Sequence, residues 1–203
     1  MIDELFLQEK KKYEKMWENE PYRVTSPGKL SVEYFLDFIK GRYCPGDSLI
    51  DFGCGSAVAT ISFLEAGFKV CLVDIAENCL DESIQTLLLL SPDVSFFLAP
   101  LWKLPQSLET SDWIYCMDVL EHLPPERVEK ALQEMAKKTK KGGALQVFLL
   151  DEGMGKMIGE TLHLTIKPLN WWIDLISTYW KIEKVECILP GIRYCIYIGP
   201  PNS

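Results

Sequence analysis

The sequence lacks any apolar run long enough to cross a membrane. The longest runs, such as the four leucines at 87–90, fall well short of the roughly 20 residues that span a bilayer. The N-terminus is charged and does not resemble a secretion signal. With 203 residues, 48% of them hydrophobic, the chain is long enough to bury one sizeable core. We therefore expect a single cytoplasmic domain over 1–203, with no membrane partner.

Paired cysteines and extended basic patches are also lacking. The seven cysteines are an odd number, and none lies in a Cys-x-x-Cys motif or near a histidine at zinc-ligand spacing. We expect reduced thiols and no metal site. The formal net charge of −8 would repel a phosphate backbone, and the short lysine clusters at 10–12 and 137–141 are typical of solvated helix faces. A small molecule is therefore a more favourable partner than nucleic acid.

The apolar pattern divides the chain into an N-terminal helical extension, 1–45, and a core of alternating elements, 46–203. Helices are expected in the extension at 3–19 and about 27–40, the first closed by Pro21. In the core, short apolar runs alternate with helical stretches, and this alternation predicts a parallel sheet. The expected strands are 48–52, 69–73, 94–99, 113–117 and 144–150, and the expected helices are 57–66, about 75–90 and 125–136.

The C-terminal part departs from this alternation. The segment 151–169 has weak periodicity and several glycines, and we interpret it as an insertion that forms a functional loop or lid. A last helix is expected at 171–180, followed by a hairpin of two apolar runs, 182–189 and 193–198. The predicted fold class is α/β, with a doubly wound, Rossmann-like, seven-stranded and mostly parallel sheet that has a C-terminal antiparallel strand.

The most informative run is an apolar strand that ends in Asp-x-Gly-x-Gly and leads into a helix. Gly53 and Gly55 lack a side chain that would block the approach of a ligand to the backbone. In open α/β sheets, ligands bind at the carboxyl ends of the strands, so a bound adenosine compound is expected over this turn. Asp74 ends the next strand, where its carboxylate can accept hydrogen bonds from both ribose hydroxyls.

With these motifs, the chain from about residue 48 to 198 resembles class I S-adenosylmethionine-dependent methyltransferases. The resemblance implies S-adenosyl-L-methionine as the cofactor and a doubly wound sheet ending in an antiparallel strand. It places Asp51 near the methionine amino group, Gly53 and Gly55 beneath the cofactor, and Asp74 on the ribose, with Ile75 beside it.

The run Asp-Val-Leu-Glu-His-Leu-Pro after the fourth predicted strand also looks like this family. By resemblance, Met117 and Asp118 face the methionine moiety. One departure concerns the adenine, since many members carry an acidic residue just after the third strand, where this chain has Pro100. Either backbone groups near Leu101 hold the adenine, with Trp102 packing nearby, or cofactor affinity is reduced. The second case would make the chain a noncatalytic interaction module.

Two histidines are candidate catalytic residues. Methyl transfer displaces an activated sulfonium leaving group, so the enzyme mainly supplies alignment and a dry site. A hydroxyl, thiol or carbon-acid acceptor would benefit from a histidine, and the chain has only His122 and His163. His122 follows the fourth predicted strand, where it either contacts the substrate or serves the hydrogen bonding of its own loop. His163 lies in the 151–169 insertion, which is expected to cover the mouth of the site.

Two other enzyme classes are less favoured. A nicotinamide-dependent oxidoreductase also needs a glycine turn, but its Gly-x-Gly-x-x-Gly fingerprint fails here because Val58 occupies the third glycine position. An enzyme that modifies nucleic-acid bases would be expected to carry Asn/Asp-Pro-Pro-Tyr/Phe where this chain has Met-Asp-Val-Leu at 117–120. We therefore predict methyl transfer to a small-molecule acceptor, and the sequence leaves the acceptor and the oligomeric state open.

Overall fold

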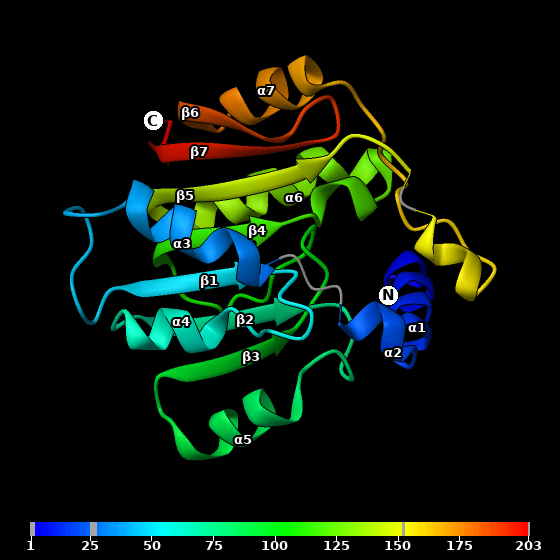
Figure 1. Cartoon of the computed structure of the whole chain (residues 1–203), viewed down its shortest axis with the longest axis horizontal. Coiled ribbons are helices and arrows are strands. Elements are labelled where there is room, and N and C mark those ends of the chain that lie inside the picture. The colour runs from blue at the N-terminus through cyan, green and yellow to red at the C-terminus, as the bar shows by residue number, and fades with distance from the viewer. Residues whose placement is uncertain (1–2, 25–27, 152, 203) are drawn as a thin grey trace.

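The computed structural model describes residues 3–24, 28–151 and 153–202. Its seven-stranded sheet has the order β3-β2-β1-β4-β5-β7-β6 (Figure 1). The strands from β3 to β5 pair in parallel, whereas β7 (Arg193–Pro201) is antiparallel to both β5 (Thr139–Phe148) and β6 (Trp180–Leu189). The predicted doubly wound, mostly parallel sheet with a C-terminal antiparallel strand is confirmed.

The first four strands lie close to their predicted positions. They are β1 (Ser48–Phe52), β2 (Lys69–Asp74), β3 (Val94–Leu98) and β4 (Ser111–Met117). Side chains alternate between the two faces of the sheet, so each face has its own hydrophobic cluster. Leu49 on β1, for example, belongs to the cluster on one face, and its neighbour Ile50 belongs to the cluster on the other.

The predicted start of β5 was wrong by five residues. We expected the lysines at 137–141 and Gly142 to end the preceding helix, but β5 already begins at Thr139 and includes Gly142 and Gly143. A Cβ added at Gly142 would lie 2.2 Å from the Ile198 carbonyl oxygen, and one added at Gly143 would lie 2.1 Å from that of Ile114. The glycines therefore allow close approach of the two neighbouring strands, and here they do not mark a helix end.

Helices cover both faces of the sheet. On one face lie α3 (Gly28–Phe38), α4 (Thr60–Glu65) and α5 (Glu82–Leu90), and on the other lie α6 (Pro125–Lys138) and α7 (Leu169–Ser177). Two helices begin later than predicted. Ala57 has a left-handed backbone (φ 57°), which a helix cannot contain, and the side chain of Asp81 caps α5 by accepting from the Ser83 N–H.

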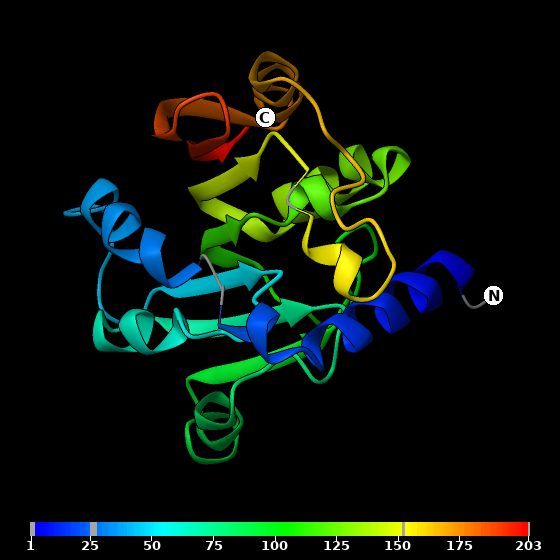
Figure 2. The same ribbon diagram turned by 45° about the vertical axis from the view of Figure 1, so that its right-hand side comes forward.

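The N-terminal helices lie beyond the carboxyl ends of the parallel strands. They are α1 (Glu4–Trp17) and α2 (Glu20–Arg23), and Figures 1 and 2 both place them past the tips of β1 and β2, beside the 3-10 turn Met154–Met157. The α2 helix was missed, because we interpreted Pro21 as a terminator although proline is well suited to a first helical turn. Among the described residues, no helix combines the length and apolar character needed to cross a membrane.

Candidate functional site

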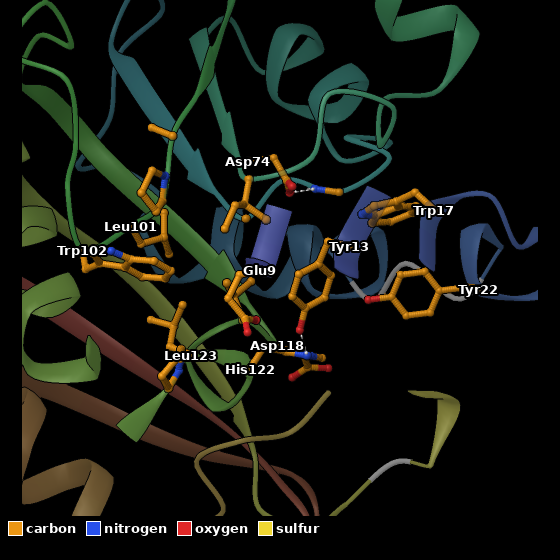
Figure 3. A pocket seen from close by; sticks show the side chains of 17 residues that line it. Glu9, Tyr13, Trp17, Tyr22, Asp74, Leu101, Trp102, Asp118, His122 and Leu123 are labelled. Atoms are coloured by element: carbon orange, nitrogen blue, oxygen red, sulfur yellow. Dashed lines mark hydrogen bonds between the residues drawn. The ribbon is translucent and has the colours of Figure 1, made fainter. Parts of the chain in front are cut away.

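A cleft lies between α1 and the carboxyl ends of β1, β2 and β4. It consists of two adjoining chambers that share wall residues, including Gly53, Gly55, Asp118 and His122. The first chamber extends to the ends of β2 and β3 (Figure 3), and the second extends toward β5, β7 and the 154–163 segment. All ten site residues that the sequence predicted line this cleft. The first chamber adds Asp74, Ile75 and Leu101, and the second adds Asp51, Met117 and His163.

The floor between the chambers is the glycine turn after β1. Gly53 and Gly55 have left-handed backbones, with φ of 69° and 54°. An added Cβ at Gly53 would lie 2.5 Å from the Cγ atoms of Val119, and one at Gly55 would lie 2.9 Å from the ring of Trp17. Both the backbone angle and the lack of space therefore require glycine at these two positions.

Asp74, at the end of β2, is hydrogen-bonded to the turn that follows β1. Its Oδ2 accepts a hydrogen bond of 2.9 Å from the Gly55 N–H (Figure 3), and its Oδ1 accepts one of 2.9 Å from the Ala76 N–H. Burial raises the pKa of this carboxyl, and the backbone N–H groups act in the opposite direction. Each carboxylate oxygen can accept a second hydrogen bond, so Asp74 can still bind hydroxyl groups in the first chamber.

Asp51 lies nearby, at the edge of the second chamber. It is 4% exposed, and burial together with the charge of Asp74 raises its pKa to about 8. A cation bound against this carboxyl would favour its ionised form and stabilise the pair of acids. The arrangement therefore fits a positively charged group on a ligand.

The far wall of the first chamber is apolar. Pro100, Leu101 and Trp102 follow β3 and are buried there, with no acidic side chain at the position of Pro100. The indole N–H of Trp102 donates a 3.1 Å hydrogen bond to Oδ2 of Asp3, the residue that caps α1. The wall is thus fixed to the N-terminal helix, and a polar contact from the segment 100–102 to a ring in this chamber has to come from backbone groups.

Asp118 is held in a strained conformation at the end of β4. It has a φ of 53°, which costs a non-glycine residue roughly 1–2 kcal/mol. Its Oδ1 accepts a 3.0 Å hydrogen bond from Nε2 of Gln146, and its Oδ2 lies 3.0 Å from Nη2 of Arg193. Burial raises the pKa of Asp118, whereas Arg193 lowers it. These contacts aim the carboxylate at the boundary between the chambers.

The two histidines are neighbours in space. Their ring centroids lie 4.5 Å apart with the planes nearly perpendicular. Nδ1 of His122 is 2.8 Å from the Tyr13 hydroxyl, and burial, followed by the proximity of His163, lowers the pKa of His122 well below its usual value. Nδ1 of His163 is hydrogen-bonded to the Leu150 carbonyl oxygen. Because a carbonyl only accepts, this nitrogen carries the proton of the neutral ring and Nε2 retains its lone pair.

Some cleft residues were not predicted from the sequence. Glu9, paired with Lys12 at 2.5 Å, lines the first chamber, and Phe148, Met154 and Arg193 line the second. Arg193 could have been found from the predicted hairpin. The antiparallel strand β7 begins beside the carboxyl end of β5, so its first residue lies at the ligand-binding edge. Glu9 gave no comparable signal, because an acid on an amphipathic helix is usually solvated.

Comparison with known proteins agrees with this architecture. Residues 49–143 match the family model described as a methyltransferase domain. No curated protein shows significant sequence similarity to the chain.

Solved methyltransferase structures share the fold. Magnesium protoporphyrin IX methyltransferase from Synechocystis PCC 6803, with bound S-adenosylhomocysteine, has a TM-score of 0.66 at 18% identity, covering 94% of this chain and 93% of that one. N-methyltransferase NodS from Bradyrhizobium japonicum WM9, with the same compound, has a TM-score of 0.67 at 14% identity, covering 95% and 98%. Phosphoethanolamine N-methyltransferase 2 from Haemonchus contortus has a TM-score of 0.66 at 13% identity, covering 85% and 53%. At these identities the likeness demonstrates the fold.

Proposed function

We propose that this chain, whose residues 49–143 match a methyltransferase domain, is a class I S-adenosylmethionine-dependent methyltransferase that methylates a small-molecule acceptor bound in the second chamber. The main support for the proposal is that two chambers with different linings lie next to each other on either side of one glycine turn. The first has the groups that bind an adenosine, and the second adjoins it at Asp118 and His122.

The first chamber fits the adenosine part of the cofactor. Asp74 can accept hydrogen bonds from the two ribose hydroxyls, since each of its oxygens has a lone pair beyond the one used by a backbone N–H. Leu101 and Trp102 provide apolar surface for the adenine, and backbone groups near Leu101 replace the acidic contact that Pro100 cannot make. Ile75 lines the same wall beside Asp74.

The boundary of the chambers fits the methionine part. The cofactor's ammonium group would bind near Asp51 and Asp118, whose carboxyl pKa values are raised by burial and would be lowered by a positive charge. Gly53 and Gly55 allow the chain of the cofactor to pass close to the backbone, and Met117 lines the floor. When bound, the cofactor supplies an activated methyl group.

The acceptor enters the second chamber opposite the cofactor. A cofactor bound in the first chamber would present its methyl carbon to a lone pair on the acceptor, and the electrons of the carbon–sulfur bond would remain on sulfur to give S-adenosylhomocysteine. We assign the positioning of the reacting atom to His122 and His163, with Phe148, whose ring centroid lies 5.4 Å from that of His163, and Arg193 lining the same chamber. Structural neighbours whose names state a porphyrin or a phosphoethanolamine substrate support a small acceptor.

We also propose that the reaction takes place in the cytoplasm and that the acceptor is not a nucleic acid. All seven cysteines are unpaired, and Cys44 and Cys187 are exposed, which suits a reducing compartment such as the cytoplasm. The net charge of −8 argues against a nucleic-acid acceptor.

The test is a calorimetric titration of the purified protein with S-adenosylmethionine and S-adenosylhomocysteine, with nicotinamide dinucleotides as controls. We expect micromolar binding of the first pair only, followed by detection of methyl transfer in a screen of small acceptors. Absence of binding would leave only a noncatalytic module with this fold. Selective binding of a nicotinamide dinucleotide would instead indicate an oxidoreductase.

A further inference from the structure

Three side chains with metal-binding atoms converge at the wall of the second chamber. Glu121 and His122 end the 3-10 turn Leu120–His122 after β4, and His163 comes from the segment that follows β5. One carboxylate oxygen and one nitrogen from each imidazole all lie within 4.8 Å of one another. The sequence suggested no metal site, because we looked for cysteine spacing and these residues are brought together only by the fold.

Glu121 has an oxygen without a partner. Its side chain is completely buried, and Oε1 accepts a 2.9 Å hydrogen bond from the Phe148 N–H. In the part of the chain that the structure describes, Oε2 has no hydrogen-bond partner. An uncompensated buried carboxyl oxygen is costly, so this atom indicates a missing ligand.

The histidines complement this oxygen. The hydrogen bond from Nδ1 of His163 to the Leu150 carbonyl fixes the ring and leaves the lone pair of Nε2 available, which is the usual arrangement of a histidine that binds metal. His122 is hydrogen-bonded to the Tyr13 hydroxyl and to the backbone of Leu162, so a cation would replace one of these two partners. Both rings line the second chamber.

We propose that Glu121, His122 and His163 bind one divalent first-row transition-metal ion. One carboxylate and two imidazoles suit ions such as Mn²⁺, Fe²⁺, Co²⁺ or Zn²⁺, and such a set leaves coordination positions open. Because both histidines line the second chamber, the open positions face the proposed acceptor.

The role of the ion rests on the proposed methyl transfer. A hydroxyl acceptor that coordinates the ion loses its proton to solvent more readily, because the ion stabilises the resulting alkoxide. The alkoxide oxygen then attacks the methyl carbon, and the carbon–sulfur bond breaks to give S-adenosylhomocysteine. His163 thus acts as a metal ligand, and the proton does not pass to its ring.

A second cluster provides a control. Cys54, Asp74 and Cys79 also have potential ligand atoms within 4.8 Å of one another. Asp74, however, is assigned to the ribose in the first chamber, and burial raises the pKa of the Cys54 thiol and so keeps it protonated. We therefore expect Cys79→Ala to leave metal binding unchanged.

The experiment measures metal binding directly. Protein treated with EDTA and dialysed into metal-free buffer is titrated with Co²⁺, followed by visible absorption, and with Mn²⁺, followed by loss of the free-ion electron paramagnetic resonance signal. We expect one ion per chain, at least 10-fold weaker binding in Glu121→Gln and His163→Gln, and wild-type binding in Cys79→Ala. Glu121→Gln is nearly isosteric, and a cooperative urea unfolding transition shows whether each variant is folded.

The proposal is overturned if the wild-type protein binds neither ion, or if Glu121→Gln and His163→Gln bind both ions as the wild type does. Loss of binding in Cys79→Ala alone would assign the ion to the other cluster and overturn it as well. The two proposals fail separately. Metal binding without any binding of S-adenosylmethionine would reject the proposed function and retain the metal site.

Discussion

The hydroxyl of Tyr13 lies 2.8 Å from Nδ1 of His122, so helix α1 is hydrogen-bonded directly to the turn that follows β4. The helix is also attached to the loop after β2, since Asn78 donates to the Glu14 carbonyl, and to the 154–158 segment, where Lys15 donates to the Ile158 carbonyl. The helix therefore forms a wall of the cleft that is fixed to several of its other walls.

Replacing Tyr13 by phenylalanine should weaken this attachment. Tyr13→Phe removes one hydrogen bond and leaves a buried histidine nitrogen without that partner, a loss of about 1 kcal/mol. We expect a roughly 5-fold lower affinity for S-adenosylhomocysteine, measured by calorimetry. Tyr34→Phe, on the exposed side of α3, is the matched control and should bind normally. Equal affinities in the two variants would show that the hydrogen bond does not support the cofactor site.

Gly53→Ala should disturb the floor of the cleft. The new Cβ would lie 2.5 Å from the side chain of Val119 and would also force alanine into a left-handed backbone. Gly41→Ala is the control that separates backbone strain from the steric clash. Gly41 has a φ of 76°, so alanine is strained there too, but an added Cβ would have no other atom within 4 Å. We expect Gly53→Ala to lower the free energy of unfolding by about 1–3 kcal/mol more than Gly41→Ala does, as is typical of overpacking. Urea denaturation measures the difference, and equal losses would contradict the role of Val119.

Asp74→Asn should impair cofactor binding more than it impairs folding. An amide keeps only one acceptor oxygen, so it cannot serve the Gly55 N–H, the Ala76 N–H and the ribose hydroxyls together. Hydrogen bonds to a charged group contribute about 1.5–3 kcal/mol, which corresponds to a roughly 10- to 100-fold loss of affinity. Calorimetry with S-adenosylmethionine provides the measurement. An unchanged dissociation constant would remove Asp74 from the site.

The cofactor-free protein should lose stability as pH rises, partly through Asp51. Its pKa is raised from 3.8 in the unfolded chain to about 8 in the fold. Between these values the folded state holds a proton that the unfolded state releases, so the contribution of Asp51 to stability is largest at low pH and is lost as pH rises through about 8. Through Asp51, the free energy of unfolding should fall by up to about 1.4 kcal/mol per pH unit in this range.

Asp51→Asn cannot ionise and should lack this contribution to the pH dependence. Urea unfolding of the two proteins at pH 5, 6, 7 and 8 without cofactor should therefore give free energies that diverge with rising pH, in favour of the variant. Parallel pH profiles would show that the pKa of Asp51 is not raised in the fold.

The strands and the glycine turn were predictable because their signals are local. Residues 48–52 alternate between two buried faces and end at Gly53, and the sequence displays both features directly. The position of α1 as a wall of the cleft was harder to predict. The apolar spacing within residues 3–19 predicted a helix, but that spacing does not show against which part of the fold the helix packs.

The proximity of Glu121, His122 and His163 could not be predicted from their spacing in the sequence. It depends on the path of the chain after β5, where the described part of the insertion contains only the short 3-10 turn Met154–Met157 and no other helix or strand. Hydrogen bonds from Thr165 to the carbonyls of Glu121 and Leu123 hold this irregular segment against the turn after β4. Such contacts between irregular segments leave no periodic pattern in the sequence.

The position of α1 also has a consequence for biosynthesis. Tyr13 and His122 are separated by 109 positions, so a ribosome makes the helix long before it makes the residues against which the helix packs. The apolar side of α1 has to remain without its final partners until β4 and the following turn have emerged. Assembly of the cleft is therefore a late event in translation, and α1, although it is synthesised before β4, reaches its contact with His122 only after β4 has been made.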